Sequence, residues 1–219
     1  MEKMHIAIDG PAGAGKSTIA KSIAKKLDIT YIDTGAMYRA LTYKVLKELI
    51  DLNNNDIIIN IVNETTIELD KNKVFLDKQD VSNEIRHPII NNNVSKIARI
   101  PEVRMKMVEI QREIAYNKSV VMDGRDIGTY VLPNANYKFY LTASIDERAY
   151  RRYLELKKKG ILASFQDIKN EIINRDKMDT ERSIAPLRPA QDAIIINTTS
   201  KSIKMVINEI IDLIGNEGK

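Results

Sequence analysis

The sequence predicts an α/β fold in which helices cover both faces of a parallel sheet. Short apolar runs alternate along the chain with stretches of helical periodicity, and a glycine-rich motif joins the first run to the first helical stretch. The chain has 219 residues, of which 43% are hydrophobic. This length and composition fit one domain, or one domain that carries insertions.

Five short runs are predicted to be buried strands, because each is apolar and is flanked by polar residues or glycine. Helical stretches alternate with them, so a five-stranded sheet with parallel strands is expected. The five runs are HIAI (5–8), TYI (30–32), SVVM (119–122), YKFYL (137–141) and AIII (193–196).

Three helices are predicted from apolar residues that repeat at helical spacing. The first pattern covers 19–27, the second covers 38–49, and the third covers 203–214. Ser200 or Ser202 is available to cap the third helix at its N-terminus. These helices are expected to pack on the sheet through their apolar faces.

Two stretches interrupt this alternation. Residues 66–81 alternate apolar and polar side chains around a polar KNK turn, which predicts a β-hairpin. It lies between the second and third strands, so an inserted subdomain is expected at about 58–95. Residues 155–188 are highly charged and form either a solvated helical hairpin or a mobile cationic lid; charge alone favours the hairpin. The core of the domain then comprises 1–57, 96–154 and 189–219.

The composition argues against several classes of protein. The absence of cysteine excludes disulfides and thiolate metal sites. No apolar run approaches the roughly 18 residues that cross a bilayer, so we expect a cytoplasmic protein without a membrane partner. The net charge of +4 fits anionic partners, but tryptophan is absent and aromatic residues make up only 5%. This leaves little stacking surface for nucleic acid, which is not expected as a partner.

The stretch GPAGAGKST fits the pattern G-x-x-x-x-G-K-[ST] of a phosphate-binding loop. Glycines let consecutive N–H groups point at a phosphate, Lys16 places a cation on the β and γ oxygens, and the Ser17 hydroxyl can ligate Mg²⁺. An ordinary glycine-rich turn is the alternative, but a strand is predicted before the motif and a helix after it. Lys16 is expected to be catalytic and to lie exposed on the loop. The predicted ATP-binding residues are Gly10, Pro11, Ala12, Gly13, Ala14, Gly15, Lys16, Ser17 and Thr18.

The phosphate-binding loop alone does not say what happens to the nucleotide. A GTPase of the switch type should carry an N-K-x-D motif, but NKVF and NKSV both lack the aspartate. No LSGGQ-like segment of a transport ATPase is present either. A small phosphotransferase is therefore the leading class, with a nucleotide-hydrolysing switch or a nucleic-acid ATPase as the alternative.

The segment VVMDGRDIGTYVLP (120–133) points to a second substrate. Asp123 ends the third predicted strand, where carboxylates in this class of fold hold Mg²⁺ directly or through water; a simple turn is the alternative. Arg125 and Asp126 follow at the edge of the sheet where ligands bind. Either they pair with surface charges, or they bind the second substrate. In the second case the guanidinium binds the phosphate of the acceptor and the carboxylate accepts a hydrogen bond from its base.

Several segments together resemble the bacterial cytidylate kinase family, in the order and spacing of that family. The likeness covers essentially the whole chain. Adenylate kinases are related but carry DG-[FY]-P-R after the third strand, and that proline and aromatic residue are absent here. The segments are GPAGAGKST, DTGAMYRA (33–40), DGRDIGTYVLPNA (123–135), FYLTAS (139–144) and RSIAPLRPAQDA (182–193).

The resemblance implies a CMP-binding site. In it Arg39 faces the monophosphate, Asp126 recognises the cytosine amino group, and Arg104 contacts the pyrimidine. Arg175 and Asp179 contact ribose and phosphate from the edge of the lid. The full implied set is Thr34, Arg39, Ser95, Arg104, Arg125, Asp126, Arg175, Asp179 and Arg182.

The resemblance also implies the catalytic cations. Arg148, Arg151 and Arg152 resemble the arginines that close over the transferring phosphoryl group. One departure is Asn197, where the family usually has an aspartate. The implied catalytic set is Lys16, Arg125, Arg148 and Arg152, and the implied metal ligands are Ser17 and Asp123.

The implied activity is the transfer of the γ-phosphoryl group of ATP to CMP with Mg²⁺ as cofactor, with dCMP as a second acceptor and a monomeric enzyme. A kinase of another small acceptor is the closest alternative. A phosphate monoester has a second pKa of about 6, so the acceptor needs no general base. This agrees with His5 and His87, which lie outside every motif and are expected to be structural or solvated. Repulsion between two bound anions also favours a cationic lid over residues 155–188.

Overall fold

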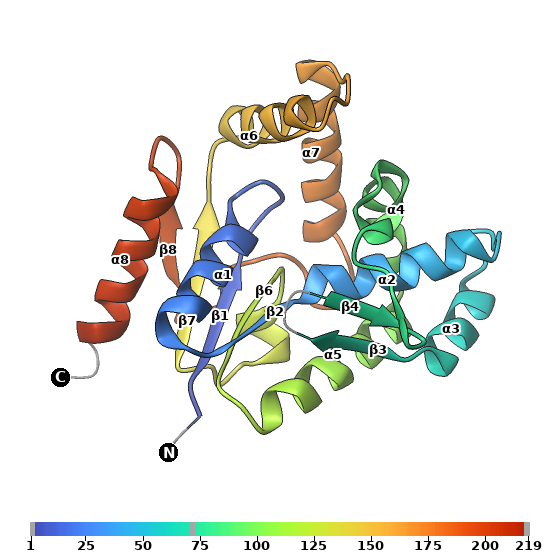
Figure 1. The fold of residues 1–219 in the computed structure, drawn as a ribbon, viewed down its shortest axis with the longest axis horizontal. Coiled ribbons are helices and arrows are strands. Elements are labelled where there is room, and N and C mark those ends of the chain that lie inside the picture. Colours follow the sequence, from blue (N-terminus) through green and yellow to red (C-terminus); the bar gives the residue numbers. More distant parts are fainter. Residues whose placement is uncertain (1–2, 71–72, 217–219) are drawn as a thin grey trace.

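The computed structural model describes residues 3–70 and 73–216. A sheet of five strands, all parallel, has the order β2-β6-β1-β7-β8 (Figure 1). This confirms the predicted fold class, and the predicted strands agree with the observed ones to within a residue or two. The strands are β1 (His5–Asp9), β2 (Thr30–Asp33), β6 (Val120–Gly124), β7 (Tyr137–Thr142) and β8 (Ile194–Asn197).

Helices cover both faces of the sheet, as predicted. On the central strand β1, Ile6 and Ile8 belong to one apolar cluster and Ala7 belongs to another. Successive side chains of a strand point to opposite faces, so β1 and its neighbour β6 each contribute to both cores. The covering helices are α1 (Lys16–Leu27) and α8 (Ile203–Asn216) on one face, and α5 (Pro101–Tyr116) on the other.

The outer strands are less buried than predicted. β2 and β8 are the two edges of the sheet, and each has a neighbouring strand on one side only. Ile32 and Ile196 are buried, but Thr30 is exposed and Ile195 is 61% exposed. The apolar run at 193–196 therefore forms a strand, but not the wholly buried strand that its composition predicted.

The helix α2 (Thr34–Lys47) ends before the predicted pattern does. Leu41 and Val45 are buried, but Leu49 has φ 56° and is 91% exposed, so its assignment to the helix is wrong. The N–H of Ile50 donates to the carbonyl of Val45, which closes the helix around a left-handed residue. At the third helix, the N–H of Met205 donates to Ser202 Oγ at 3.2 Å, so Ser202 is the cap.

A group of small elements lies between β2 and β6 in the chain and packs around α2 (Figure 1). The predicted hairpin is confirmed as β3 and β4, although two residues of its KNK turn lie outside the described residues. The two-residue strand β5 was too short to show a pattern. Most of these elements share one apolar cluster with α2 and α5, which includes Met37 and Met107. The predicted boundaries of the inserted subdomain, 58–95, stay a prediction. The elements are α3 (Asn55–Glu64), β3 (Ile67–Asp70), β4 (Lys73–Leu76), β5 (Gln79–Asp80), η1 (Glu84–Arg86) and α4 (Pro88–Ala98).

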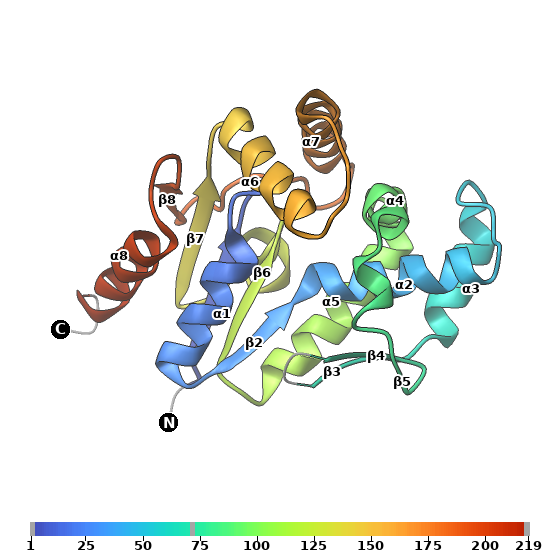
Figure 2. The ribbon, with the colours of Figure 1, turned by 45° about the horizontal axis from the view of Figure 1, so that its top comes forward.

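The helices α6 (Ile145–Lys158) and α7 (Phe165–Thr180) form a hairpin beyond the carboxyl ends of the strands (Figures 1 and 2). They pack on each other through a small apolar cluster of their own that includes Ala149, Leu156 and Ile172. The lid range 155–188 begins inside α6 and stays a prediction. None of the helices in the described part of the chain has the length and apolar character needed to span a bilayer.

Candidate active site

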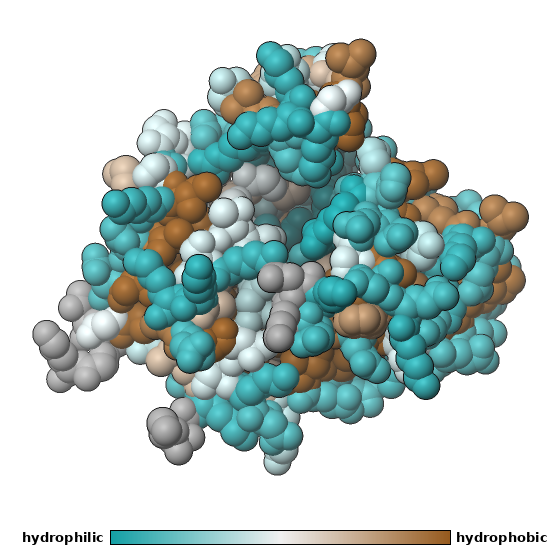
Figure 3. Space-filling model, in the orientation of Figure 1, coloured by the Kyte–Doolittle hydropathy of each residue, from teal (hydrophilic) through white to brown (hydrophobic). Residues whose placement is uncertain are grey.

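A cavity of about 560 Å³ lies at the carboxyl ends of β2 and β6, with α6 and α7 on one side and α2 and α4 on the other. Figure 3 shows a hollow between these helices that is surrounded mainly by hydrophilic residues. Cationic side chains outnumber carboxylates in its lining, which favours anionic ligands. The arginines that line it are Arg39, Arg86, Arg104, Arg125, Arg152, Arg175 and Arg182.

The loop 10–18, called the donor loop below, connects β1 to α1 at one end of this cavity. Its first residue, Gly10, has φ 144°, and a Cβ atom there would lie 2.0 Å from the carbonyl oxygen of Leu141. Gly13 and Gly15 also have positive φ, at 78° and 91°. Glycine is therefore required for the curled backbone that the motif predicted.

Lys16 is buried, which corrects the expectation of an exposed loop residue. It is only 6% exposed, and its Nζ donates to the carbonyl oxygen of Pro11 at 2.8 Å. The donor loop wraps around the side chain, so the ammonium group lies inside the curl. Burial, followed by the neighbouring charge of Arg125, lowers the pKa of Lys16 to about 7.

The two predicted metal ligands lie together. Ser17 Oγ donates to Asp123 Oδ2 at 2.8 Å, and Tyr31 donates its hydroxyl to Asp123 Oδ1 at 2.7 Å. Hydroxyl and carboxylate oxygens are the hard ligands that Mg²⁺ prefers, and Mg²⁺ sites use one or two carboxylates with substrate phosphates. Among the described residues, no group of three or more His, Cys, Asp or Glu side chains is placed to hold a metal ion. Sequence reasoning missed Tyr31, because it reaches Asp123 from another strand.

At the opposite end of the cavity, Asp126 forms a buried ion pair with Arg104 of α5. The guanidinium of Arg104 also donates to the Ala98 carbonyl at 3.1 Å and lies over the Tyr38 ring. Arg182 is 3.5 Å from Asp126 on the other side. The structure therefore brings together three of the residues predicted for the acceptor, and the buried Ser95 lines the same cavity.

A second group of charges surrounds Asp33, which sequence reasoning left out of the site. Its carboxylate accepts from Arg39 at 3.1 Å and from Arg86 at 3.0 Å, and it caps α2 through the Ala36 N–H. Burial opposes ionisation, but Arg39 and Arg86 outweigh it and lower the pKa of Asp33. The predicted Thr34 hydroxyl donates to a backbone carbonyl at 2.6 Å.

The helix α7 contributes the remaining predicted residues of the acceptor site. Asp179 accepts from Arg125 Nε at 2.7 Å, and Arg182 lies 4.0 Å from the same carboxylate. Arg175 lines the cavity, and its buried Nε has no hydrogen-bond partner in the described part of the chain. Burial and the charge of Arg125 lower the pKa of Arg175 to about 10.

The three arginines predicted to close over the phosphoryl group take different positions. Arg148 is buried outside the cavity lining, and its Nη1 donates to the Ala12 carbonyl at 3.0 Å and to Asp176 at 2.6 Å. Arg151 donates to Thr198. Arg152 alone of the three lines the cavity. The first turn of α6 packs against the donor loop, so the position of Arg148 is one of support for that loop.

The loop after β8 also contacts the donor loop. Thr198 Oγ1 donates to the Ala14 carbonyl at 3.3 Å, and Asn197 accepts from the Thr199 N–H at 2.9 Å. An asparagine supports this turn without a charge. Neither histidine lies in the cavity lining: His5 lies 3.2 Å from a backbone carbonyl of α5, and His87 precedes α4.

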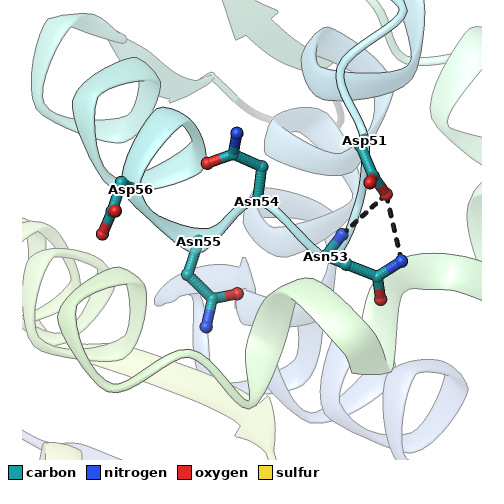
Figure 4. A pocket seen from close by; sticks show the side chains of 5 residues that line it. All are labelled: Asp51, Asn53, Asn54, Asn55 and Asp56. Carbon is teal, nitrogen blue, oxygen red and sulfur yellow. Dashed lines mark hydrogen bonds between the residues drawn. The ribbon is translucent and has the colours of Figure 1, made fainter.

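A polar hollow of about 510 Å³ lies between α2 and α3 (Figure 4). Asp51 accepts from the N–H and the side-chain amide of Asn53, and Asn54 caps α3 through the N–H of Ile57. Asn55 and Asp56 point away from Asp51. The polar groups of this loop therefore serve the loop itself.

The sheet order, the donor loop at the end of β1 and the cationic cavity define a kinase of the P-loop class. Solved structures with this fold include an uncharacterized protein from Eubacterium ventriosum, at a TM-score of 0.54 and 15% identity, which covers 98% of this chain and 99% of that one. A shikimate kinase from Bacteroides thetaiotaomicron matches at a TM-score of 0.50 and 15% identity, over 97% and 98% of the two chains. At such low identity these likenesses show the fold alone.

Comparison of sequences shows the family. The family model described as cytidylate kinase matches residues 6–216. A cytidylate kinase of Alkaliphilus oremlandii is 56% identical, over 98% of this chain and 99% of the relative. One of Clostridioides difficile is 52% identical over the same shares. The chain belongs to the cytidylate kinase family.

Proposed function

We propose that this enzyme transfers the γ-phosphoryl group of ATP to CMP, giving ADP and CDP, and that dCMP is a second acceptor. The observation that carries the proposal is the buried pair of Arg104 and Asp126, which lies in the same cavity as the donor loop. The names of the relatives support it. The substrates are small nucleotides, and we expect a cytoplasmic monomer that needs neither nucleic acid nor a membrane.

The donor loop binds the phosphate chain of ATP in this proposal. Its backbone N–H groups and the ammonium of Lys16 meet the β and γ phosphates, where negative charge must be neutralised during transfer. Ser17 and Asp123 would hold Mg²⁺, and Tyr31 keeps the Asp123 carboxylate turned toward Ser17. When bound, the ion supplies further neutralisation of phosphate charge.

The arginines at the centre of the cavity bind the acceptor phosphate. We assign this role to Arg39, Arg125 and Arg175, with Arg152 at the lid side. Phosphate at neutral pH is largely deprotonated, so alignment and charge neutralisation perform the catalysis and no side chain has to remove a proton. Closure of the lid segment 155–188 would exclude water, the competing acceptor.

Asp126 and Arg104 read the base. Cytosine presents an amino donor beside the acceptor N3, whereas uracil presents an acceptor oxygen beside a donor N–H. The Asp126 carboxylate accepts from the amino group of cytosine but repels the oxygen that uracil has in its place. The Arg104 guanidinium donates to N3 of cytosine, whereas N3 of uracil carries a hydrogen and cannot accept. An unpaired buried group costs about 1 to 3 kcal/mol or more. The pair should therefore favour CMP over UMP by at least about a hundredfold in kcat/KM.

A coupled assay of ADP formation over a panel of monophosphates tests the proposal. We expect turnover that depends on CMP; turnover without CMP would indicate a hydrolase, and preference for another acceptor would indicate a different kinase. Asp126→Ala should lose activity mainly on CMP and reduce the CMP-to-UMP ratio. Arg39→Ala is the matched control, because a change at the phosphate should weaken both substrates alike. An Asp126→Ala enzyme that keeps the preference would contradict the assignment.

A further inference from the structure

Asp9 is the last residue of β1 and directly precedes Gly10, the first residue of the donor loop. Its side chain is 4% exposed and bonds to the segment that follows β6. One carboxylate oxygen accepts from the N–H of Ile127 at 2.8 Å, and the other accepts from the N–H of Gly128 at 2.7 Å. Both oxygens therefore bind the backbone of one short segment.

That segment, η2 (Ile127–Val131), cannot satisfy these two N–H groups itself. The internal bonds run from Tyr130 and Val131 back to the Asp126 carbonyl, so the first N–H groups have no acceptor within the segment. Asp9 supplies the acceptor from a different strand. Two bonds to consecutive N–H groups fix both the position and the orientation of the backbone where η2 begins.

The residues immediately before these N–H groups are Arg125 and Asp126. We propose that Asp9 is a positioning residue for the acceptor: its carboxylate holds the segment after β6 so that Arg125 and Asp126 face the substrate in register with the donor loop. This inference rests on the proposed function. The inference extends the proposed function, because a single side chain, that of Asp9, then connects the start of the donor loop to the residues that bind the acceptor.

Burying a carboxylate at this position costs free energy, which favours a role for Asp9 in positioning the acceptor site over a role in stabilising the fold. Burial raises the pKa of Asp9 to about 7, so the charged form is held against a desolvation penalty. The main chain of Asp9 lies in the centre of the sheet, paired with Gly124 on β6 and Tyr140 on β7. A change confined to the side chain should leave the start of the donor loop in place.

Asp9→Asn tests the inference, because it keeps the shape and removes one acceptor. We expect KM for CMP to rise at least about tenfold and the CMP-to-UMP ratio in kcat/KM to fall by a similar factor. The dissociation constant for ATP, titrated without CMP, should change by less than about twofold. Asp192→Asn is the matched control: Asp192 pairs with Lys138, which packs beside Gly128, but it touches neither N–H group. Asp192→Asn should leave KM for CMP and the dissociation constant for ATP unchanged.

Gly128→Ala is the second variant, because it disturbs the same contact from the other partner. Its Cβ would lie 3.2 Å from Lys138 Cδ and 3.5 Å from Asp9 Oδ2, so it crowds the side chains that pack on this contact, and a loss in the same direction on the CMP side is expected. The inference would be overturned if the folded variants kept the wild-type KM for CMP, or if their affinity for ATP fell by the same factor. Failure of both variants to fold would also overturn it, since Asp9 would then determine stability. If the wild-type enzyme does not phosphorylate CMP, the proposed function itself fails.

Discussion

Arg125 Nε lies 2.7 Å from Asp179 Oδ2, and this ion pair joins the end of β6 to α7. Both side chains are largely buried, at 17% and 8% exposed. Asp179 therefore orients Arg125, and it attaches the helical hairpin of α6 and α7 to the edge of the sheet.

Replacing Asp179 by asparagine should destabilise the protein in a pH-dependent way. Burial opposes ionisation of Asp179, but Arg125, Arg175 and Arg182 outweigh it and lower the pKa. A lowered pKa means that the charge stabilises the fold above the usual carboxylate value of 3.8 and that this contribution is lost as the pH falls below it. Asp179→Asn should cost about 3 kcal/mol at neutral pH, the lower end for breaking a buried pair. Urea unfolding at several pH values measures it, and a difference that persists unchanged in acid would contradict the ionic explanation.

Lys16→Met should abolish most turnover while the protein stays folded. The ammonium acts on charge that develops during transfer, and loss of one such group lowers kcat by about a hundredfold or more. Methionine keeps most of the buried chain of Lys16, so the thermal unfolding midpoint should stay close to that of the wild type. The matched variant Lys16→Ala should lose the same activity and more stability. Near-normal kcat in Lys16→Met would rule out the donor loop as the ATP site.

The amides of residues 155–188 should exchange rapidly with solvent in the free enzyme and slow down when both nucleotides are bound. The hairpin has only a small apolar cluster of its own, and Leu162 at its tip is fully exposed. Hydrogen exchange with mass spectrometry measures this, with α8 as the internal control that should not change. Equal protection with and without nucleotides would favour a static solvated hairpin.

Replacement by alanine should have opposite effects on stability at Gly10 and at Gly215. At Gly10 the φ of 144° and the 2.0 Å approach to the Leu141 carbonyl leave no room for a Cβ, so Gly10→Ala should destabilise the fold and weaken ATP binding. At Gly215, inside α8, nothing lies within 4 Å of the added atom. Gly215→Ala should stabilise the protein by up to about 1 kcal/mol. Thermal unfolding and ATP titration distinguish the two, and a harmless Gly10→Ala would contradict the described loop.

Local patterns were sufficient where neighbouring residues decide the structure. The alternation of apolar runs predicted the parallel sheet, because strand and helix periodicities are properties of a few consecutive residues. GPAGAGKST predicted the donor loop for the same reason, and the segment after the third strand predicted that Asp126 would lie at the edge of the sheet.

Only the tertiary structure decided which charges meet. With 34 basic and 30 acidic residues, the sequence offers far more pairs than a fold can form. Asp33 with Arg86, Arg148 with Asp176, and Asp9 with the N–H groups of η2 each join residues of different elements. The burial of Lys16 and the exposure of Leu49 have the same cause: how the chain curls around a residue, or turns away from it, depends on contacts that no local pattern contains.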